Sequence, residues 1–178
     1  ALRYSSKPVY PMSMATLSVI LGSVREGRNG QRVANWVMQH APQAELLDLK
    51  VFNLPHYDEA KTPDELQGKY SHPQAQLWHD KIVASDRLIF ITPEYNHSYP
   101  AVLKNAIDYM FSAWKGKAYA LISYSIGNWG GVRAAMQLRG LLDYIGLQCQ
   151  GELNIPLVNT KDLPTKQLQK LLTQLSHE

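Results

Sequence analysis

Short apolar runs alternate along this chain with longer segments in which apolar residues recur every three or four positions. Three of the runs are apolar almost throughout and border glycine or proline, which is typical of strands buried on both faces of a parallel sheet. Together with an alternating segment and a mixed one, they predict strands at 16–21, 45–49, 87–92, 117–124 and 148–158.

Segments with a helical period lie between these strands and after the last of them. They predict helices at 31–39, 71–84, 100–114, 132–145 and 165–175. A strand followed by a helix thus occurs about five times, an order that predicts an α/β fold with a doubly wound, five-stranded parallel sheet. Ligands of such sheets bind beyond the carboxyl ends of the strands, which directs attention to the turns after Leu21, Thr92 and Tyr124.

The length of 178 residues suits a single domain, which we place at 16–178. Residues 1–15 contain two prolines and no apolar core of a signal peptide, so we expect a poorly ordered extension. No run of about 18 apolar residues occurs, so we expect a cytoplasmic protein with no membrane partner. Residues 52–68, with two prolines and several charges, are predicted to form a long loop.

Charge and cysteine content argue against several classes of function. The formal net charge is only +3 and the basic residues are scattered, so we expect no nucleic-acid partner. The single cysteine, Cys149, excludes a disulfide framework or a cysteine metal cluster within one chain. It begins a predicted strand and has no activating neighbour in sequence, so we expect a buried, inert thiol.

The turn after the first strand is rich in hydrogen-bond donors. Its sequence, GSVREGRNGQR at 22–32, leads from a strand into a helix, where free backbone N–H groups make a site for a phosphate. Ser23, Arg25 and Asn29 are the predicted phosphate contacts, and Asn29 is also a candidate helix cap. The alternative is a plain strand-to-helix turn, and Arg28 is interpreted as a solvated side chain.

The spacing of this turn bears on which phosphate it binds. It is not Gly-x-Gly-x-x-Gly, which disfavours a dinucleotide turn of the Rossmann type. Four residues separate Gly22 from Gly27, as in a P-loop, but Arg28 and Asn29 stand where that motif has Lys and Ser or Thr. The hydroxyl that would bind magnesium is therefore missing, and a nucleoside triphosphatase is a poor interpretation.

The turn after the third strand suits a flat heteroaromatic ring. Its sequence, TPEYNHSYP at 92–100, offers stacking surface and edge donors through Tyr95, Asn96 and His97. Glu94 is interpreted as a carboxylate that anchors the loop, because no second acid lies near it in sequence. His97 considered singly could equally be a surface histidine.

The turn after the fourth strand, SIGNWGG at 125–131, contains several glycines. Glycines there would let backbone N–H groups approach the edge of a ring closely. The alternative is an ordinary connection with a glycine at the start of the following helix, so this turn alone is a weak signal.

Together the three turns resemble the NAD(P)H-dependent FMN reductase family, which includes quinone, azo-dye and chromate reductases. The resemblance rests on Gly-Ser-x-Arg after the first strand, PEYNHSYPAVLKNAIDY at 93–109 and Gly-Gly-x-Arg at 130–133. It covers about residues 16–151 and implies a flavodoxin-like fold with tightly but non-covalently bound FMN. It also implies NADPH or NADH as hydride donor, and a homodimer or homotetramer.

The resemblance further implies a set of cofactor-binding residues. These are Ser23, Arg25, Asn29, Gly30 and Gln31 on the phosphate side, Pro93, Glu94, Tyr95, Asn96 and His97 on the ring side, and Ser125, Gly127 and Gly130 on a second wall. No catalytic acid or base and no metal ligand is assigned, because the flavin carries the chemistry. A proton could come from His97, Tyr95 or water.

We therefore expect an FMN-dependent oxidoreductase. Hydride would pass from NAD(P)H to the flavin, and two electrons would then reduce a quinone, a free flavin, an azo compound or a metal oxyanion. Arg25, Arg28 or Lys61 are candidates to contact the 2′-phosphate of NADPH. The alternatives are a non-enzymatic flavin electron carrier or a redox-responsive protein-binding partner and, with less support, a phosphohydrolase.

Large apolar side chains on two predicted helices favour the homodimer or homotetramer. Trp78 lies on one helix, and Tyr109, Phe111 and Trp114 lie on the other. They exceed what one inward stripe can bury, so we expect a subunit interface to cover some of them. A single large core is the alternative.

Overall fold

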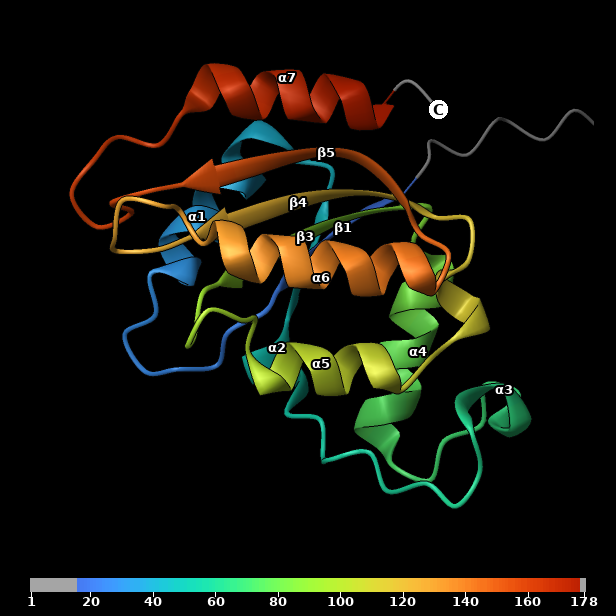
Figure 1. Cartoon of the computed structure of the whole chain (residues 1–178). Helices are drawn as coiled ribbons and strands as arrows, with labels where there is room; N and C mark the ends of the chain where they lie inside the picture. Colours follow the sequence, from blue (N-terminus) through green and yellow to red (C-terminus); the bar gives the residue numbers. More distant parts are fainter. Residues whose placement is uncertain (1–15, 177–178) are drawn as a thin grey trace, which may run out of the picture.

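Five parallel strands form one sheet in this computed structural model, which describes residues 16–176 (Figure 1). The strands are β1 (Leu17–Leu21), β2 (Glu45–Asp48), β3 (Arg87–Pro93), β4 (Ala118–Tyr124) and β5 (Gln148–Ile155). Their order is β2-β1-β3-β4-β5, and every paired strand runs parallel to its neighbour. This confirms the predicted doubly wound, flavodoxin-like arrangement. The predicted extension at 1–15 lies outside the described residues.

Helices cover both faces of this sheet (Figure 1). One face packs against α1 (Gly30–His40) and α7 (Thr165–Ser176), and the other against α2 (Leu49–Phe52), α4 (Pro73–Ala84), α5 (Ala101–Asp108) and α6 (Val132–Tyr144). Successive strand residues point to opposite faces, so Ile20 and Phe90 join one core while Val19 and Ile89 join the other. This arrangement explains why the central strands are apolar throughout.

The chain reverses its direction of travel across the sheet between β1 and β3. From β1 it passes to β2 on one side, and it then returns to β3 on the other side. The turns after β1, β3 and β4 consequently meet at one edge, where the connections diverge and leave a crevice. The fold therefore brings together the three turns that the sequence singles out.

The segment at 52–68 contains more regular structure than the predicted loop. The second strand ends at Asp48, whose carboxylate caps the short helix α2 by accepting the Lys50 N–H at 2.9 Å. A second short helix, α3 (Pro63–Leu66), begins with a capping box between Thr62 and Glu65. The sequence analysis missed both helices, of which α3 lies within the predicted loop and α2 ends at its first residue, because each is only four residues long and too short to show a period.

The helix predicted at 100–114 ends earlier, at Asp108. Trp114 lies beyond it in a short 3₁₀ helix, η1 (Ser112–Trp114). The indole N–H of Trp114 donates to the carbonyls of Ile107 and Met110, each at 3.1 Å. These two bonds join η1 to the end of α5.

A single core buries most of the aromatic side chains that were expected at an interface. Trp78, Tyr109 and Trp114 are fully buried, and only Phe111 is substantially exposed. Three of these four residues therefore belong to the core between α4, α5 and the sheet, and of the four only Phe111 is available to the expected subunit interface. Cys149 is only partly buried, contrary to the expected buried thiol.

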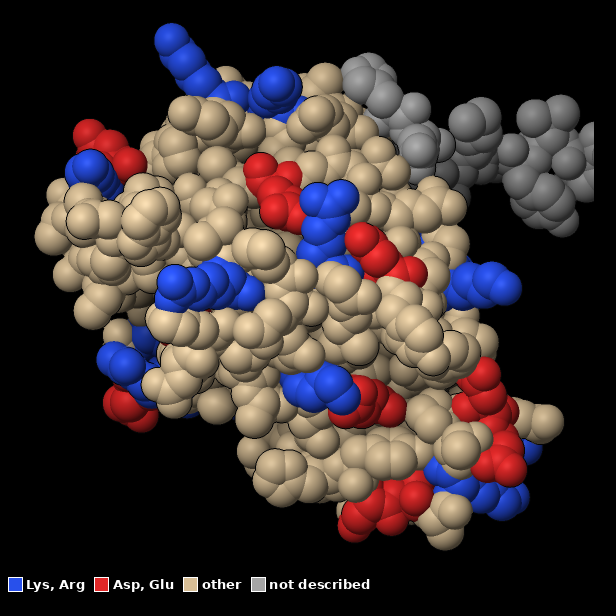
Figure 2. All heavy atoms as spheres, viewed as in Figure 1, with Lys and Arg blue, Asp and Glu red and all other residues tan. Residues whose placement is uncertain are grey.

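Charges of both signs are interspersed over the face shown in Figure 2. Lysines and arginines alternate there with aspartates and glutamates, and no broad basic stripe crosses that face. Among the described helices, none has both the length and the apolar character needed to cross a bilayer.

We expect Trp114→Ala to lower the free energy of unfolding of the ligand-free protein by about 3–5 kcal/mol, because it opens a cavity in the core. Trp129, whose side chain is 80% exposed, supplies the matched control. Trp129→Ala should change stability by about 0.5 kcal/mol or less. Urea denaturation measures both values, and equal losses would contradict the assignment of Trp114 to the core.

Candidate functional site

A cavity of about 180 Å³ opens at the carboxyl edge of the sheet. The three turns after β1, β3 and β4 line it, with Arg25, Arg28, Asn29, Pro93, Glu94, Tyr95, Tyr124, Ser125 and Ile126. Most of these residues were predicted to form the site. The structure thus gathers side chains that lie up to about a hundred positions apart in the sequence, as expected where parallel strands end together.

The first turn contains unpaired donors, and two of its residues with such groups, Arg25 and Asn29, line this cavity. Within residues 16–176, the backbone N–H groups of residues 24–27 donate no hydrogen bond, and Arg25 has no ion pair. Asn29 occupies the N-cap position of α1 but makes no side-chain capping bond, so its amide is also available. One cationic side chain, an amide and several N–H groups around a small cavity are a suitable set of donors for a phosphate.

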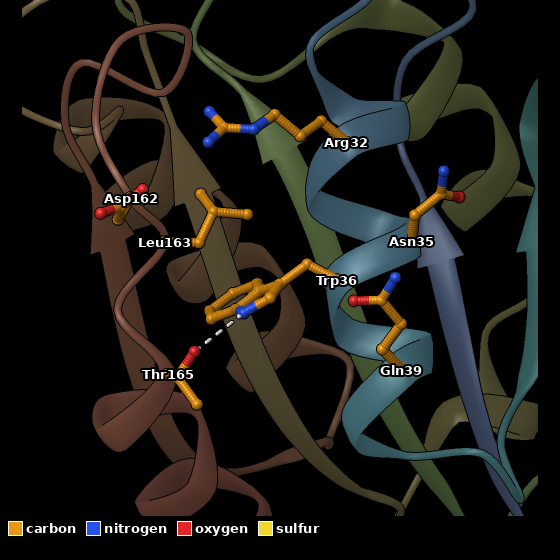
Figure 3. A pocket seen from close by; sticks show the side chains of 7 residues that line it. All are labelled: Arg32, Asn35, Trp36, Gln39, Asp162, Leu163 and Thr165. Carbon is orange, nitrogen blue, oxygen red and sulfur yellow. Dashed lines mark hydrogen bonds between the residues drawn. The ribbon is translucent and has the colours of Figure 1, made fainter.

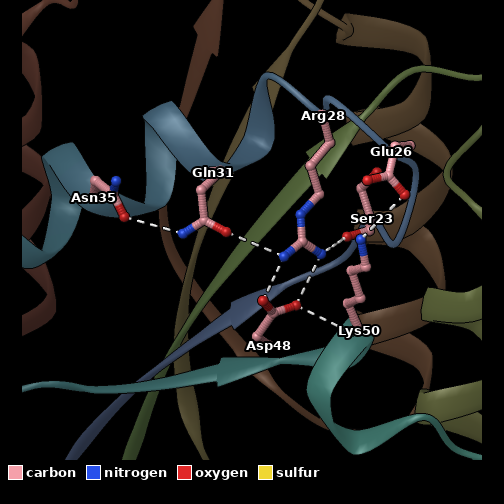
Figure 4. Close-up of polar contacts among 7 residues, drawn as sticks. All are labelled: Ser23, Glu26, Arg28, Gln31, Asn35, Asp48 and Lys50. Atoms are coloured by element: carbon pink, nitrogen blue, oxygen red, sulfur yellow. Dashed lines mark hydrogen bonds and ion pairs between the residues drawn. The ribbon is translucent and has the colours of Figure 1, made fainter.

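Arg28 holds the first turn in place (Figure 4). Its guanidinium forms a two-pronged ion pair with Asp48 at the end of β2, including an Nη1–Oδ1 distance of 2.8 Å, and it also donates to the Ser23 carbonyl. Side-chain exposure is 8% for Arg28 and 13% for Asp48, so the interpretation of Arg28 as solvated was wrong. The ion pair with Asp48 also neutralises the charge of Arg28. Arg25 is then the arginine of residues 22–29 that has no carboxylate partner.

Gln31, a predicted phosphate contact, is engaged in the same network (Figure 4). Its Oε1 accepts from Arg28 Nη2 at 3.1 Å, and its Nε2 donates to Asn35 Oδ1 at 3.0 Å. The side chain therefore lies along the flank of α1 and does not line the cavity. Its role in the described structure is to support Arg28.

Three hydroxyl groups meet beneath the cavity, from Ser23, Tyr95 and Tyr124. The Ser23 and Tyr95 hydroxyl oxygens are 2.9 Å apart, which joins the first turn to the second. Tyr124, the last residue of β4, places its hydroxyl against the start of α1, where a Cβ on Gly30 would collide with it. Burial raises the pKa of Tyr124 and outweighs the opposite effects of Ser23, Arg28 and the Gly30 N–H, so this hydroxyl stays protonated.

Tyr124 was missed by the sequence analysis. It is the last residue of a predicted strand, directly before the turn at 125–131. The rule that ligands bind beyond strand ends could therefore have identified it. The apolar pattern of β4 made it look like one more core residue.

The second turn is a tight hairpin, and its first residue, Tyr95, lines the cavity. Tyr95 and Ser98 exchange two backbone hydrogen bonds, Tyr95 N–H to Ser98 O at 2.8 Å and Ser98 N–H to Tyr95 O at 3.0 Å. The two residues between them, Asn96 and His97, have left-handed φ angles of 50° and 64°. Within the described chain, the N–H groups of Glu94, Asn96 and His97 donate no hydrogen bond, so all three are available to the edge of a ring.

Glu94 anchors this turn, as the sequence analysis predicted. Its carboxylate accepts the N–H of Arg133 at 3.0 Å and of Ala134 at 3.2 Å, both in the first turn of α6. The second turn is thereby fixed to the helix that follows the third turn. A carboxylate at a helix N-terminus also interacts favourably with the helix dipole.

The third turn packs against the end of β5. Ser125 N–H donates to the Ile155 carbonyl at 3.1 Å, and the Gly127 carbonyl accepts from Leu157 N–H at 3.1 Å. Gly130 has a φ of 61°, and a Cβ there would collide with the backbone of β5. Gly127 and Gly130 therefore shape the turn, while Ser125 lines the cavity.

A larger hollow of about 660 Å³ lies elsewhere, between α1 and the segment that follows β5 (Figure 3). Arg32 at its edge donates to the carbonyls of Val158 and Lys161, and Trp36 Nε1–H donates to Thr165 Oγ1 at 3.3 Å. Arg32, Trp36 and Thr165 thus already bind neighbouring parts of the chain, and we place the candidate functional site in the smaller cavity, where the three turns meet. Across residues 16–176, no cluster of three or more His, Cys, Asp and Glu side chains could hold a metal ion.

Comparison with known proteins gives a consistent result. Residues 15–160 match the family model described as NADPH-dependent FMN reductase. An NAD(P)H-dependent FMN reductase of Schizosaccharomyces pombe is 34% identical over 135 residues, covering 73% of this chain and 66% of the relative. A quinone reductase of Pseudomonas putida is 35% identical over 143 residues, covering 75% of this chain and 73% of the relative. The chain thus spans about two thirds of the length of the first and somewhat more of the second.

A solved structure resembles this fold. It is FerB, a flavoenzyme NAD(P)H:(acceptor) oxidoreductase from Paracoccus denitrificans, with 32% sequence identity and a TM-score of 0.64. The match covers 76% of this chain and 74% of FerB.

We expect Arg28→Ala to destabilise the ligand-free protein by on the order of 3 kcal/mol, because it leaves Asp48 nearly buried without its partner. Lys50→Ala removes a neighbouring cation whose partner Glu26 is 97% exposed, so its effect should be about 0.5 kcal/mol or less. Thermal and urea unfolding give both values. If Arg28→Ala were as stable as Lys50→Ala, Arg28 would not be the anchor of the first turn.

Proposed function

The chain belongs to the NADPH-dependent FMN reductase family and is an FMN-dependent oxidoreductase that uses NAD(P)H, and from this premise we propose how its site serves that activity. The phosphate of FMN binds in the first turn, and the flavin ring lies between the second and third turns. The observation that chiefly supports this placement is that Arg25 lines one small cavity without an ion pair, in a turn where the N–H groups of residues 24–27 donate no hydrogen bond within the described chain.

The phosphate end of the site is proposed to consist of Arg25, Asn29, Tyr124 and the turn backbone. Arg25 supplies the charge, and Tyr124 supplies a hydroxyl that burial keeps protonated and hence able to donate. Ser23 lies directly beneath and connects to Tyr95. Gly30 has no side chain and so leaves the Tyr124 hydroxyl room beside the start of α1.

The ring end is proposed to consist of the hairpin at 95–98 and the turn at 125–130. The N–H groups of Glu94, Asn96 and His97 are the candidate donors to the edge of the ring, and Pro93 and Ser125 form the walls. Bound FMN supplies the redox chemistry, so the residues of the chain bind, orient and shield it. No side chain is needed as a general acid or base.

Flat acceptors such as quinones are the proposed second substrates. Tyr95 and Ile126 line the cavity with exposed side chains, and Trp129 of the third turn is 80% exposed, so these residues offer apolar surface to a flat molecule. The relative from Pseudomonas putida is named as a quinone reductase, which supports the same class of acceptor. A carrier that docks onto basic partner proteins would itself be acidic, whereas this chain has a net charge of +3.

A homodimer remains a proposal, which now rests on Phe111 and on Tyr144, a residue that the sequence argument did not include. Phe111 and Tyr144 are 46% and 78% exposed, and their ring centroids lie 6.5 Å apart. This exposed aromatic pair borders Leu141 and Met110, and a second subunit is a natural partner for such a surface. The homotetramer and the cytoplasmic location stay predictions from the sequence.

We expect Arg25→Ala and Tyr124→Phe each to raise the dissociation constant for FMN roughly ten- to a hundredfold, since each removes a hydrogen bond to a charged group. Neither should alter the affinity for riboflavin, which lacks the phosphate. Lys50→Ala is the control for a nearby charge that does not line the cavity. Quenching of flavin fluorescence measures the constants, and equal binding of riboflavin and FMN by the unaltered protein would refute the phosphate site.

Steady-state kinetics should be ping-pong if one cavity serves both substrates. Nicotinamide must then leave before a quinone can stack at the same place, so double-reciprocal lines will be parallel and excess quinone will compete with NAD(P)H. Tyr95→Ala should lower quinone turnover more than FMN retention, because the phosphate still holds the cofactor, while Tyr95→Phe keeps the stacking ring. Intersecting lines would reveal a ternary complex and exclude the shared cavity.

A further inference from the structure

The hairpin at 95–98 adopts a conformation that its own sequence does not favour. Two-residue hairpin turns with both central residues left-handed usually contain glycine, because a side chain makes this backbone region unfavourable. Here the central residues are Asn96 and His97, with φ angles of 50° and 64°. Asparagine tolerates the region, whereas histidine adopts it less readily, so contacts from outside the turn are needed to hold it.

Gln137, in the second turn of α6, makes such contacts with both ends of its amide. Its Nε2 donates to the His97 carbonyl at 2.8 Å, and its Oε1 accepts the Ser98 hydroxyl at 2.8 Å. Only a side chain with one donor and one acceptor at its tip can make both bonds. A glutamate of the same length could accept from Ser98 but could not donate to the carbonyl.

The same helix also holds the residue before the hairpin. Glu94 accepts the N–H groups of Arg133 and Ala134, so α6 binds the chain both before and after Asn96. The helix is a rigid support, because Leu138 and Leu142 on its inner side are fully buried. Figure 1 shows α6 starting at the carboxyl edge of the sheet, next to the turns of the site.

We propose that Gln137 is a positioning residue for the flavin ring: through His97 and Ser98 it keeps the unpaired N–H groups of Asn96 and His97 directed at the ring edge. This inference rests on the proposed function. Gln137 does not line the cavity, so its effect on a ligand passes through the hairpin.

The test compares Gln137→Ala and Gln137→Glu with Met136→Ala, a change at the neighbouring position, where the side chain is 67% exposed. The ligands are FMN, riboflavin and lumiflavin, which share the ring but differ in the phosphate and ribityl chain. Both Gln137 variants should raise all three dissociation constants by one common factor, roughly three- to tenfold for the loss of neutral hydrogen bonds. Met136→Ala should change none of them.

Two further measurements separate positioning from general stability. The melting temperature of the ligand-free Gln137 variants should stay close to that of the unaltered protein, because Gln137 lies on the surface. The midpoint potential of the bound flavin should fall in Gln137→Ala and not in Met136→Ala, since donors at the ring edge favour the more electron-rich reduced ring. Ser98→Ala removes one of the two bonds and should give a smaller shift in the same direction.

Riboflavin and lumiflavin binding that is unchanged in both Gln137 variants would overturn the proposal, as would an unchanged midpoint potential. A loss confined to FMN would assign Gln137 to the phosphate end and overturn it too. The proposed function fails separately, if the unaltered protein binds none of the three flavins.

Discussion

Backbone N–H groups that find no partner within the folded chain are the constraint on which the rest of this structure depends. A buried unpaired N–H is costly, so such groups persist only where they face an open cavity that water or a ligand can enter. Here they lie in the turns after β1 and β3, at residues 24–27 and at Glu94, Asn96 and His97. A turn that makes few hydrogen bonds of its own is not held by its own backbone, and other parts of the chain must fix its shape.

The two turns are fixed by different kinds of interaction. The first is held by an ion pair, in which Asp48 takes up the charge of Arg28 and leaves Arg25 without a carboxylate partner. The second is held by Glu94 at the N-terminus of α6 and by the neutral amide of Gln137, while the Arg133 guanidinium lies against the His97 side chain, 3.0 Å from Nδ1. The first turn therefore depends on a charged pair between the ends of two strands, whereas the hairpin depends on hydrogen bonds to a single helix.

Sequence patterns predicted the sheet well because an apolar run reports burial directly, and all five strands lie within about three residues of their expected bounds. The same signal failed for α5, since apolar residues continue at helical spacing after the backbone leaves the helix at Asp108. Arg28 was misread because its partner Asp48 is twenty positions away, beyond any local pattern. The three strand-end turns were found by topology alone, whereas the roles of Tyr124 and Gln137 depend on tertiary contacts.

The Ser23–Tyr95 hydrogen bond is the point at which the two turns meet. Ser23 is fully buried and does not line the cavity, so its hydroxyl can act on the proposed phosphate only through a neighbouring group. Tyr124 is such a neighbour, since a hydrogen bond with Ser23 opposes the effect of burial on the pKa of Tyr124. A hydroxyl has one proton, so a chain in which Tyr95 donates to Ser23 and Ser23 donates to Tyr124 leaves the Tyr124 proton for the phosphate. In that arrangement, binding at one end of the site favours the conformation required at the other, although no backbone hydrogen bond joins residues 23–29 to residues 94–98.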